Sequence, residues 1–389
     1  MDGAKFAKML SDKHLFELDR MEYKYSVSSV NEFTELLRQN FAQSLPLVDF
    51  SSDELFYLPN LARISTNGMK QLLSAPASNQ SFGLQAMTEE IHATFQIESI
   101  HSSRNSIRHI LNGYAPRNEE ESRIYGMKRG LDFIADRQNT ITEENLHQLY
   151  QISTGDYLPD EDRLLPDHFY RHDVVYVVDG EESREGLPAQ QLPDAMKRLV
   201  DFANAKDGIN ELHKAAILHF SFAYYHPYFD GNGRTARLLH LWYLVQQGYP
   251  AALFTPFSRY IAESKAAYYK AYDRVEKNAL ISGYTDVTPF LSYFCNEVYN
   301  RLQVDVAPPQ ADLQVYQTAL AEGKITEKER LLWEYVLSAY GTEEFTTKQL
   351  EKDFRNAAYA TIRTFVMKFH EMELLVARKT GNRVFYKVK

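Results

Sequence analysis

Residues 226–237, "HPYFDGNGRTAR", constrain the fold most, because neither a helix nor a strand favours this mixture of proline, glycine and charge. Pro227 disfavours helical geometry at His226, so the apolar helix predicted over Glu211–Tyr224 must end there. A second helix is predicted over Thr235–Gln247, where apolar residues recur three and four positions apart. The sequence therefore predicts two consecutive helices joined by an irregular loop.

The end of this loop is suited to an anion. Gly231 and Gly233 let backbone N–H groups point inward, and the following helix adds the positive end of its dipole. Asn232 lies between the glycines, and Arg234 and Arg237 supply guanidinium groups, which bind phosphate in a bidentate manner. We therefore expect these five residues to bind phosphate groups.

Two further side chains add chemistry to the loop. Asp230 would repel bound phosphates unless a cation bridged them, which indicates Mg²⁺. His226 titrates near neutral pH and can take a proton from an attacking hydroxyl group. Each residue alone also fits a turn or a solvated surface loop, but the ordered set favours transfer of a phosphorus-containing group from a nucleotide.

Helical spacing dominates most of the remaining chain and predicts a mainly α protein. The other predicted helices are Val30–Gln43, Gln85–Asn112, Glu119–Ile134, Glu143–Gln151, Leu192–Asn204, Ser264–Glu276 and Pro289–Leu302. The segment Arg171–Gly186 differs, because Val174, Val175, Tyr176, Val177 and Val178 form a run typical of a strand and polar turn residues follow. This hairpin is either a small decoration or a flap over a site.

The string at 226–237 resembles the signature of the Fic family: His-Pro-Phe, any residue, Asp or Glu, Gly-Asn-Gly-Arg, two residues, Arg. The one departure is Tyr228 in place of Phe, and we expect it to keep the aromatic packing role. The resemblance implies a helical core with a hairpin flap. It also implies transfer of AMP from ATP to a hydroxyl side chain of a target protein, with release of pyrophosphate.

The resemblance assigns roles to the loop residues. It makes His226 the base that deprotonates the target hydroxyl and Asp230 the ligand of Mg²⁺ on the α- and β-phosphates. Asn232 and the Gly231 and Gly233 backbone would cradle the phosphates, and Arg234 and Arg237 would bind the β- and γ-phosphates. The hairpin at Val174–Val178 would dock the target segment by strand addition.

The resemblance also suggests a place for adenosine in the helical region that follows the loop. Tyr260, Tyr269 and Tyr272 are candidates for the adenosine side, although core packing is the favoured role for each of them. His219 is expected to be a core histidine, and His168 and His172 are expected at the surface.

A second motif of the family is an inhibitory helix with Ser or Thr, three residues, Glu, then Gly or Asn. This chain has "TFQIES", in which Thr94 and Glu98 fit and Ser99 departs from the pattern. Glu98 would neutralise Arg237 and take the place of the γ-phosphate. The alternative is a solvated surface position for Glu98. The resemblance does not say whether such inhibition acts within one chain or between the chains of a homodimer.

The end of the chain predicts a separate module. "VDVAPPQADL" suggests a linker over 304–324, and three amphipathic helices and a hairpin over 325–389 resemble a winged helix-turn-helix. Thr326 with Glu329 forms a predicted capping box. The second half of the module is basic, so it would bind DNA or dock a protein. Its third helix carries an apolar face of Tyr359, Ile362, Phe365, Val366 and Phe369, which is expected to be core.

The predicted organisation is a helical region at 1–115 that ends in the inhibitory helix, a Fic core at 116–303, the linker and the winged helix. A single cysteine, Cys295, rules out an intrachain disulfide, and we expect a cytoplasmic protein without membrane spans. A net charge of −9 disfavours nucleic-acid coating by the whole chain. Two alternatives to adenylylation remain: removal of AMP with Glu98 orienting water, and a DNA-binding regulator whose core senses nucleotide.

Overall fold

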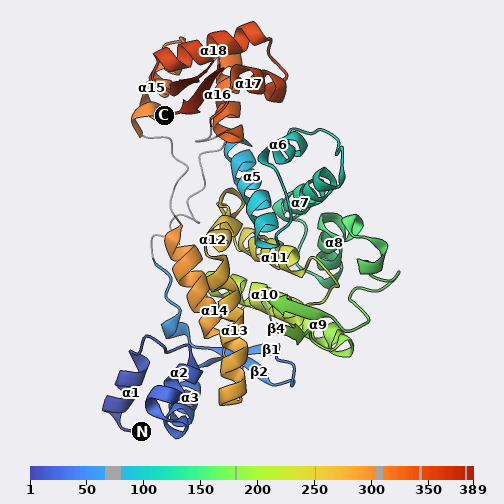
Figure 1. Ribbon diagram of the computed structural model, residues 1–389, viewed down its shortest axis with the longest axis vertical. Coiled ribbons are helices and arrows are strands. Elements are labelled where there is room, and N and C mark those ends of the chain that lie inside the picture. Colours follow the sequence, from blue (N-terminus) through green and yellow to red (C-terminus); the bar gives the residue numbers. More distant parts are fainter. Residues whose placement is uncertain (66–79, 180–181, 250, 303–309, 341–343, 382) are drawn as a thin grey trace.

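A computed structural model describes residues 1–65, 80–179, 182–249, 251–302, 310–340, 344–381 and 383–389 of the chain. The predicted mainly α architecture is confirmed, and these described residues include three short two-stranded hairpins among the helices (Figure 1). Within the described part, no helix combines the length and the apolar character needed to cross a bilayer.

The first part of the chain is helical but also contains a hairpin that the sequence did not predict. Its elements are α1 (Gly3–Leu10), α2 (Leu18–Tyr25), α3 (Val27–Phe41), β1 (Gln43–Val48) and β2 (Glu54–Tyr57). The strands pair antiparallel, and Phe56 of β2 also exchanges backbone hydrogen bonds with Thr285 and Val287 far along the chain. The hairpin therefore ties this region to the centre of the molecule.

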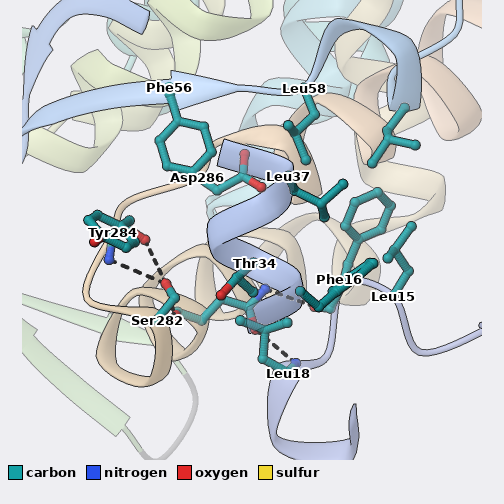
Figure 2. A pocket seen from close by; sticks show the side chains of 13 residues that line it. Leu15, Phe16, Leu18, Thr34, Leu37, Phe56, Leu58, Ser282, Tyr284 and Asp286 are labelled. Atoms are coloured by element: carbon teal, nitrogen blue, oxygen red, sulfur yellow. Dashed lines mark hydrogen bonds between the residues drawn. The ribbon is translucent and has the colours of Figure 1, made fainter. Parts of the chain in front are cut away.

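A pocket lies between this region and the loop before α14 (Figure 2). Apolar side chains from Leu15 to Leu61 line most of it, and Asp286 contributes a carboxylate next to Phe56. No residue of the 226–237 loop belongs to its lining, so it is separate from the predicted phosphate site.

The middle of the chain builds the main core. Its helices are α5 (Gln80–Ile97), α6 (Arg104–Leu111), α7 (Glu119–Ala135), α8 (Glu143–Ser153), α9 (Leu192–Asn204), α10 (Glu211–Tyr225), α11 (Asn232–Gln246), α12 (Phe257–Glu263), α13 (Lys265–Ser282) and α14 (Thr288–Tyr293). One hairpin, β3 (Tyr176–Asp179) with β4 (Glu182–Glu185), lies among them. Short 3₁₀ turns are η1 (Pro59–Leu61), η2 (Gly155–Tyr157), η3 (Asp160–Asp162), η4 (Ala189–Gln191), η5 (Ala252–Phe254) and η7 (Tyr299–Arg301), and η6 (Phe294–Val298) is a π-helical turn.

Helices α10 and α11 form the centre of this core. Nearly every residue of both helices is buried, as expected for helices that are apolar around their whole circumference. They pack against each other, and α7, α9 and α14 surround them (Figure 1). The irregular loop between α10 and α11 is therefore held from both ends by rigid helices.

Two predicted helices are wrong in their extent. The helix predicted over Gln85–Asn112 is two helices, because Ser99 adopts a left-handed conformation and Ser103 starts α6 by accepting a hydrogen bond from the Ser106 N–H. The helix predicted over Pro289–Leu302 is regular only in α14 and continues as π-helical and 3₁₀ turns. The predicted linker at 304–324 also contains a helix, α15 (Gln310–Ala321).

The last part of the chain has the predicted order of three helices and a hairpin. Its elements are α16 (Glu327–Ala339), α17 (Thr347–Phe354), α18 (Tyr359–Glu371), β5 (Leu375–Thr380) and β6 (Arg383–Val388), with a core of their own. The capping box of Thr326 and Glu329 is present. Tyr359 is 41% exposed, so its predicted core position is wrong, because it begins α18 at the edge of that core.

This C-terminal domain rests on α5 and α6. Helix α16 packs against α5 (Figure 1). The buried Arg108 of α6 donates to the Ala339 carbonyl at the end of α16 over 2.9 Å, and the Tyr335 hydroxyl donates to Asn112 over 3.1 Å. Three basic residues of this domain pair with carboxylates: Lys368 with Glu329, Arg378 with Glu344 and Lys389 with Glu373.

Candidate functional site

The loop between α10 and α11 is closed by its own side chains. His226 ends α10 in a left-handed conformation (φ 55°), and its N–H donates to the Phe222 carbonyl. The Asn232 side chain accepts from the Tyr228 N–H (2.9 Å) and donates to the Tyr228 carbonyl (2.8 Å). Tyr228 is fully buried and stacks on Tyr150 with ring centroids 3.6 Å apart, which agrees with the packing role expected for it.

Asn232 therefore holds the shape of the loop with its side chain. Its amide oxygen and its amide nitrogen each bond to the Tyr228 backbone, so in this conformation the side chain closes the loop on itself. Gly231 precedes it with φ of 82°, and a Cβ there would lie 2.3 Å from the Thr154 side chain. Both the backbone angle and the contact require glycine at 231.

The charged residues of the loop contact one another. The Asp230 carboxylate accepts from the Gly231 N–H (2.6 Å) and pairs with the Arg234 guanidinium over 2.8 Å. Arg234 and Arg237 lie one turn apart on α11 and are both buried, so their charges need partners. Asp230 remains about half exposed at the mouth of the loop.

The main partner comes from the end of α5. One Glu98 oxygen lies 2.5 Å from Nη2 of Arg237, and the other lies 2.7 Å from Nε of Arg234. Glu98 thus bridges both arginines expected to bind phosphate, and it does so within one chain. The surface position considered for Glu98 is not what the structure shows.

Thr94 completes the contacts of Arg237. Its hydroxyl accepts from the Arg237 Nε over 2.5 Å, and its carbonyl accepts from Nη2 over 3.4 Å. Burial alone would lower the pKa of Arg237, but the nearby Glu98 charge and hydrogen bond raise it above its ordinary value. The guanidinium therefore stays charged and is oriented by α5.

The backbone conformation of Ser99 shows why the motif has glycine or asparagine at this position. Its φ is 58°, a left-handed conformation that glycine and asparagine adopt more readily than serine. Its hydroxyl accepts from the Lys265 ammonium over 3.2 Å. Helix α5 ends at Ile97, and Glu98 and Ser99 lie in the turn that follows. Serine in place of glycine or asparagine therefore affects the backbone of the turn that carries Glu98.

The predicted hairpin is present, and its first strand begins two residues later than predicted. Strand β3 pairs with β4 in antiparallel register, with Tyr176 opposite Glu185 and Val178 opposite Ser183. Val174 and Val175 precede the strand, and Val177 lies within it. Val174 and Tyr176 are 53% and 61% exposed, so apolar surface faces solvent beside the loop.

An arginine that the sequence did not reveal, Arg171, links this hairpin to the loop. The Arg171 guanidinium is buried and donates to the His226 carbonyl over 2.7 Å. The backbone N–H of Arg171 donates to the Pro227 carbonyl over 2.9 Å. The sequence pattern around Arg171 predicts only the strand that follows it. No spacing of residues indicates that an arginine will donate to distant backbone carbonyls.

Of the three candidate adenosine residues, Tyr269 contacts the end of α5. Tyr269 donates to the Ile97 carbonyl over 3.4 Å, Tyr272 stacks on Phe220 in the core, and Tyr260 packs against the same core. Tyr272 is therefore a packing residue. Tyr260 and Tyr269 are partly exposed and stay candidates for the adenosine side.

Two histidines, His219 and His240, are buried in the core. His219 contacts the Tyr268 hydroxyl over 2.8 Å, and burial, followed by the charges of His240 and Arg237, holds the pKa of His219 well below its ordinary value. Burial likewise lowers the pKa of His240 to about 3. Neutral core histidines match the prediction for His219, and His168 and His172 are exposed as expected.

The described residues offer limited ligands for a metal. None of them form a cluster of three or more His, Cys, Asp or Glu side chains that could enclose an ion. Asp230 is a single exposed carboxylate beside the predicted phosphate site. This suits Mg²⁺, which is commonly held by one or two carboxylates together with water and substrate phosphates.

Comparison with known proteins agrees with this geometry. Residues 140–244, which span α8, the hairpin and the loop, match the model of the Fic/DOC family. This chain carries a Fic domain. The Fic domain therefore contains His226 and all of the candidate phosphate residues, while Thr94, Glu98 and Ser99 lie before the matched segment.

The curated relatives of this Fic domain are protein adenylyltransferases. Protein adenylyltransferase fic-1 of Caenorhabditis elegans is 30% identical over 102 residues, which is 26% of this chain and 18% of the relative. Protein adenylyltransferase Fic of Nematostella vectensis is 28% identical over 141 residues, 34% of this chain and 31% of the relative. The match thus spans less than a third of these relatives.

The fold extends beyond the matched segment. A crystal structure of a Fic family protein from Desulfovibrio desulfuricans G20 superposes with a TM-score of 0.51 at 16% identity, covering 84% of this chain and 97% of that structure. At this identity the comparison shows the fold alone. The shared fold therefore includes segments on both sides of residues 140–244.

Proposed function

We propose that this chain is an ATP-dependent protein adenylyltransferase that Glu98 holds in an inactive state. The relatives named above support the reaction class. The observation that carries the proposal is the bridge from Glu98 to Arg234 and Arg237, because a carboxylate occupies the two cations that would hold the nucleotide phosphates.

In the proposed reaction, the target hydroxyl oxygen attacks the α-phosphorus of ATP. His226 accepts the hydroxyl proton, a P–O bond forms to the target, and the bond between the α-phosphorus and the bridging oxygen breaks. Pyrophosphate leaves with its charge held by Arg234 and Arg237. The N–H groups of Asn232 and Gly233 at the start of α11 provide donors for the phosphates, whereas the Gly231 N–H donates to Asp230.

Mg²⁺, when bound beside Asp230, would neutralise phosphate charge and favour departure of pyrophosphate. Asp230 already contacts Arg234, so the same carboxylate orients a cationic side chain and lies within reach of an ion. The exposed flap residues Val174 and Tyr176 would align the target segment, which places its hydroxyl near His226.

The inhibition follows from charge. With Glu98 in place, the two arginines are neutralised, and the γ-phosphate of ATP would have to displace a carboxylate that makes short contacts with both. ATP then binds without its α-phosphorus facing the target. Removing the Glu98 charge frees both guanidinium groups for the nucleotide.

Labelled ATP tests the proposal. Wild type, Glu98→Ala and the double variant Glu98→Ala with His226→Ala are incubated with lysate protein and ATP labelled on the α- or the γ-phosphate. We expect Glu98→Ala to raise α-label incorporation by about 10- to 100-fold, the equivalent of losing one or two charged hydrogen bonds. The double variant should incorporate no label.

Glu89→Ala is the matched control. Glu89 is a carboxylate on α5, the helix that precedes Glu98, and it pairs with Arg104 at 3.1 Å. It should leave incorporation unchanged. Transfer of γ-label alone would replace adenylylation by a kinase-like reaction. If Glu98→Ala instead abolishes release of AMP from a modified protein, Glu98 serves hydrolysis and the proposed direction is wrong. DNA binding that survives His226→Ala would instead support a regulator.

A further inference from the structure

We propose that Arg171 is a positioning residue, which holds His226 and the base of the flap hairpin in one fixed relation. The inference rests on the proposed function, because it explains how a docked target would be placed against the base. Its guanidinium donates to three backbone carbonyls from three segments: His226 (2.7 Å), Asp173 (2.6 Å) and Leu187.

The burial of Arg171 makes these bonds strong. Arg171 is only 2% exposed, and burial lowers the pKa of its guanidinium, which Asp173 partly offsets. Arginine remains protonated even so, because its ordinary pKa is far above neutral pH. A buried charged group that loses a hydrogen-bond partner incurs a free-energy cost, because no water replaces that partner. This cost keeps each of the three carbonyls bonded to Arg171.

The first carbonyl fixes the base itself. His226 has a left-handed backbone, which is uncommon for a residue with a side chain. Arg171 binds the carbonyl of His226 with its side chain and the carbonyl of Pro227 with its backbone N–H. The peptide groups that follow His226 and Pro227 are therefore both pinned, and this fixes the direction in which the imidazole leaves the chain.

The other two carbonyls lie on the two sides of the flap. Asp173 precedes β3, and Leu187 follows β4, so one guanidinium joins both ends of the hairpin. The Gly186 N–H donates to the Val175 carbonyl (2.9 Å), and the Leu187 N–H donates to the Tyr225 carbonyl (3.3 Å). The hairpin is thereby attached to the end of α10, directly before His226.

Gly186 allows this close arrangement. A Cβ at this position would lie 2.8 Å from Nη2 of Arg171, 2.9 Å from the Val175 side chain and 3.3 Å from Cβ of His226. The returning strand thus passes directly beside the base and the guanidinium. A target segment added to β3 would take its position relative to His226 from this clamp of Arg171, Gly186 and the three carbonyls.

The clamp acts on the target side of the reaction. Its contacts reach the hairpin and residues 226–227, whereas Arg234 and Arg237 are oriented by Asp230, Glu98 and Thr94. Loss of the Arg171 guanidinium should therefore lower kcat and leave the KM for ATP nearly unchanged. A small misplacement of a base is enough to slow transfer by up to about 100-fold.

The kinetic test uses the full chain with Glu98→Ala, and it measures α-label incorporation against ATP concentration. We expect Arg171→Ala to lower kcat by about 10- to 100-fold with the KM for ATP within about twofold. Arg171→Lys and millimolar guanidinium added to Arg171→Ala should each restore part of kcat. Lys214→Gln is the control, because Lys214 is also a buried cation that donates to a backbone carbonyl. It lies on α10, and its acceptor is the Ala205 carbonyl at 2.7 Å, which is not part of the 226–237 loop.

Hydrogen exchange tests the same clamp without any enzymatic activity. In Arg171→Ala and Arg171→Lys, the amides of Val175–Tyr176 and Gly186–Leu187 should exchange at least about tenfold faster, while those of α11 stay protected. Equal acceleration of exchange throughout the chain would overturn the proposal, and so would the same exchange pattern in Lys214→Gln. In the kinetic test, a rise in the KM for ATP that accounts for the loss of activity would also overturn it. If neither Arg171 variant folds, Arg171 is a folding residue and the proposal is wrong.

The two proposals fail separately. If Glu98→Ala transfers no AMP to any protein, the proposed function is wrong, and the exchange measurement still decides whether Arg171 fixes the hairpin to His226. If transfer occurs but exchange at the hairpin is unchanged, the function stands and the clamp does not.

Discussion

Glu98 reaches the loop at 226–237 only because residue 233 has no side chain. A Cβ on Gly233 would lie 2.6 Å from Oε1 of Glu98 and 3.2 Å from Nη1 of Arg237. Such a contact is too short for a carbon atom, so one of these groups would have to move. The glycine expected to expose backbone N–H groups to phosphate therefore also gives the carboxylate room.

This relation predicts the effect of Gly233→Ala. Residue 233 lies in the first turn of α11, where alanine is compatible with the backbone, so the new methyl group should displace Glu98 rather than unfold the helix. We expect AMP transfer to rise about 10-fold in the otherwise wild-type chain, as for one weakened charged hydrogen bond. In the Glu98→Ala background the same change should give no rise. An equal effect in both backgrounds would contradict the contact.

Thr94→Val should release Arg237 in part. The variant keeps the shape of the side chain but loses the acceptor for the Arg237 Nε–H, which costs about 1 to 3 kcal/mol when a buried donor is left unpaired. The free arginine then competes better for phosphate, so basal transfer should rise, but less than in Glu98→Ala. Thr88→Val is the control, because Thr88 is also buried in α5 and its hydroxyl donates only to the Leu84 carbonyl. A matching rise in the control would show that α5 is merely loosened.

Ser99→Gly should strengthen the inhibited state. The left-handed backbone at Ser99 costs a non-glycine residue about 1 kcal/mol, and glycine removes that cost in the turn that carries Glu98. Basal AMP transfer should fall by several-fold, and thermal unfolding measured by calorimetry should shift upward. Ser52→Gly offers a matched comparison, since Ser52 is exposed with φ of 67° in the β1–β2 turn. It should affect unfolding alone, and reduced transfer there would argue against a specific role of the Ser99 turn.

Asp286 gives the stability a dependence on pH. Burial raises its pKa to about 6, although hydrogen bonds from Thr288 oppose the shift. In the unfolded chain this pKa returns to about 4, so between pH 4 and 6 the folded state binds a proton that the unfolded state has released. The free energy of unfolding therefore falls as pH rises through that window and stays low above it. Asp286 retains some exposure, which limits the loss to about 1 to 2 kcal/mol.

Asp286→Asn should remove this dependence, because the amide oxygen can still accept from the Thr288 N–H without becoming charged. Urea unfolding should show the variant more stable than wild type at pH 7.5 and similar to it at pH 4. Asp136→Asn provides the comparison, since Asp136 is exposed and accepts from the Gln138 N–H in the same way. An equal gain from both substitutions would exclude the buried carboxylate as the cause.

The loop at 226–237 could be predicted from the sequence because its chemistry is local. Histidine, carboxylate, glycines and arginines lie within twelve positions, so their types and order already limit what the loop can bind. The helices on either side follow from apolar spacing. Glu98 was found through the short motif around Thr94, and the structure brings it to arginines more than 130 residues away.

The rest depends on contacts that no local pattern encodes. Arg171 lies 55 residues before His226, and its acceptors are backbone carbonyls, which every residue has. The break after α5 depends on one serine in a left-handed conformation, and helical spacing continues across it. The amide of Asn232 was assigned to phosphate by analogy, whereas the Tyr228 backbone takes both of its hydrogen-bonding atoms.

The packing of α16 on α5 has a thermodynamic consequence. Thr94 is part of α5 and Glu98 follows it, so the C-terminal domain rests on the helix that carries the partners of Arg237. Any ligand of this domain whose affinity differs between the docked and undocked positions of α5 is linked to nucleotide binding. The linkage is reciprocal: a nucleotide that displaces Glu98 and α5 must change the affinity of that ligand by the same factor. The nucleotide site and the C-terminal domain would then report on each other through one helix.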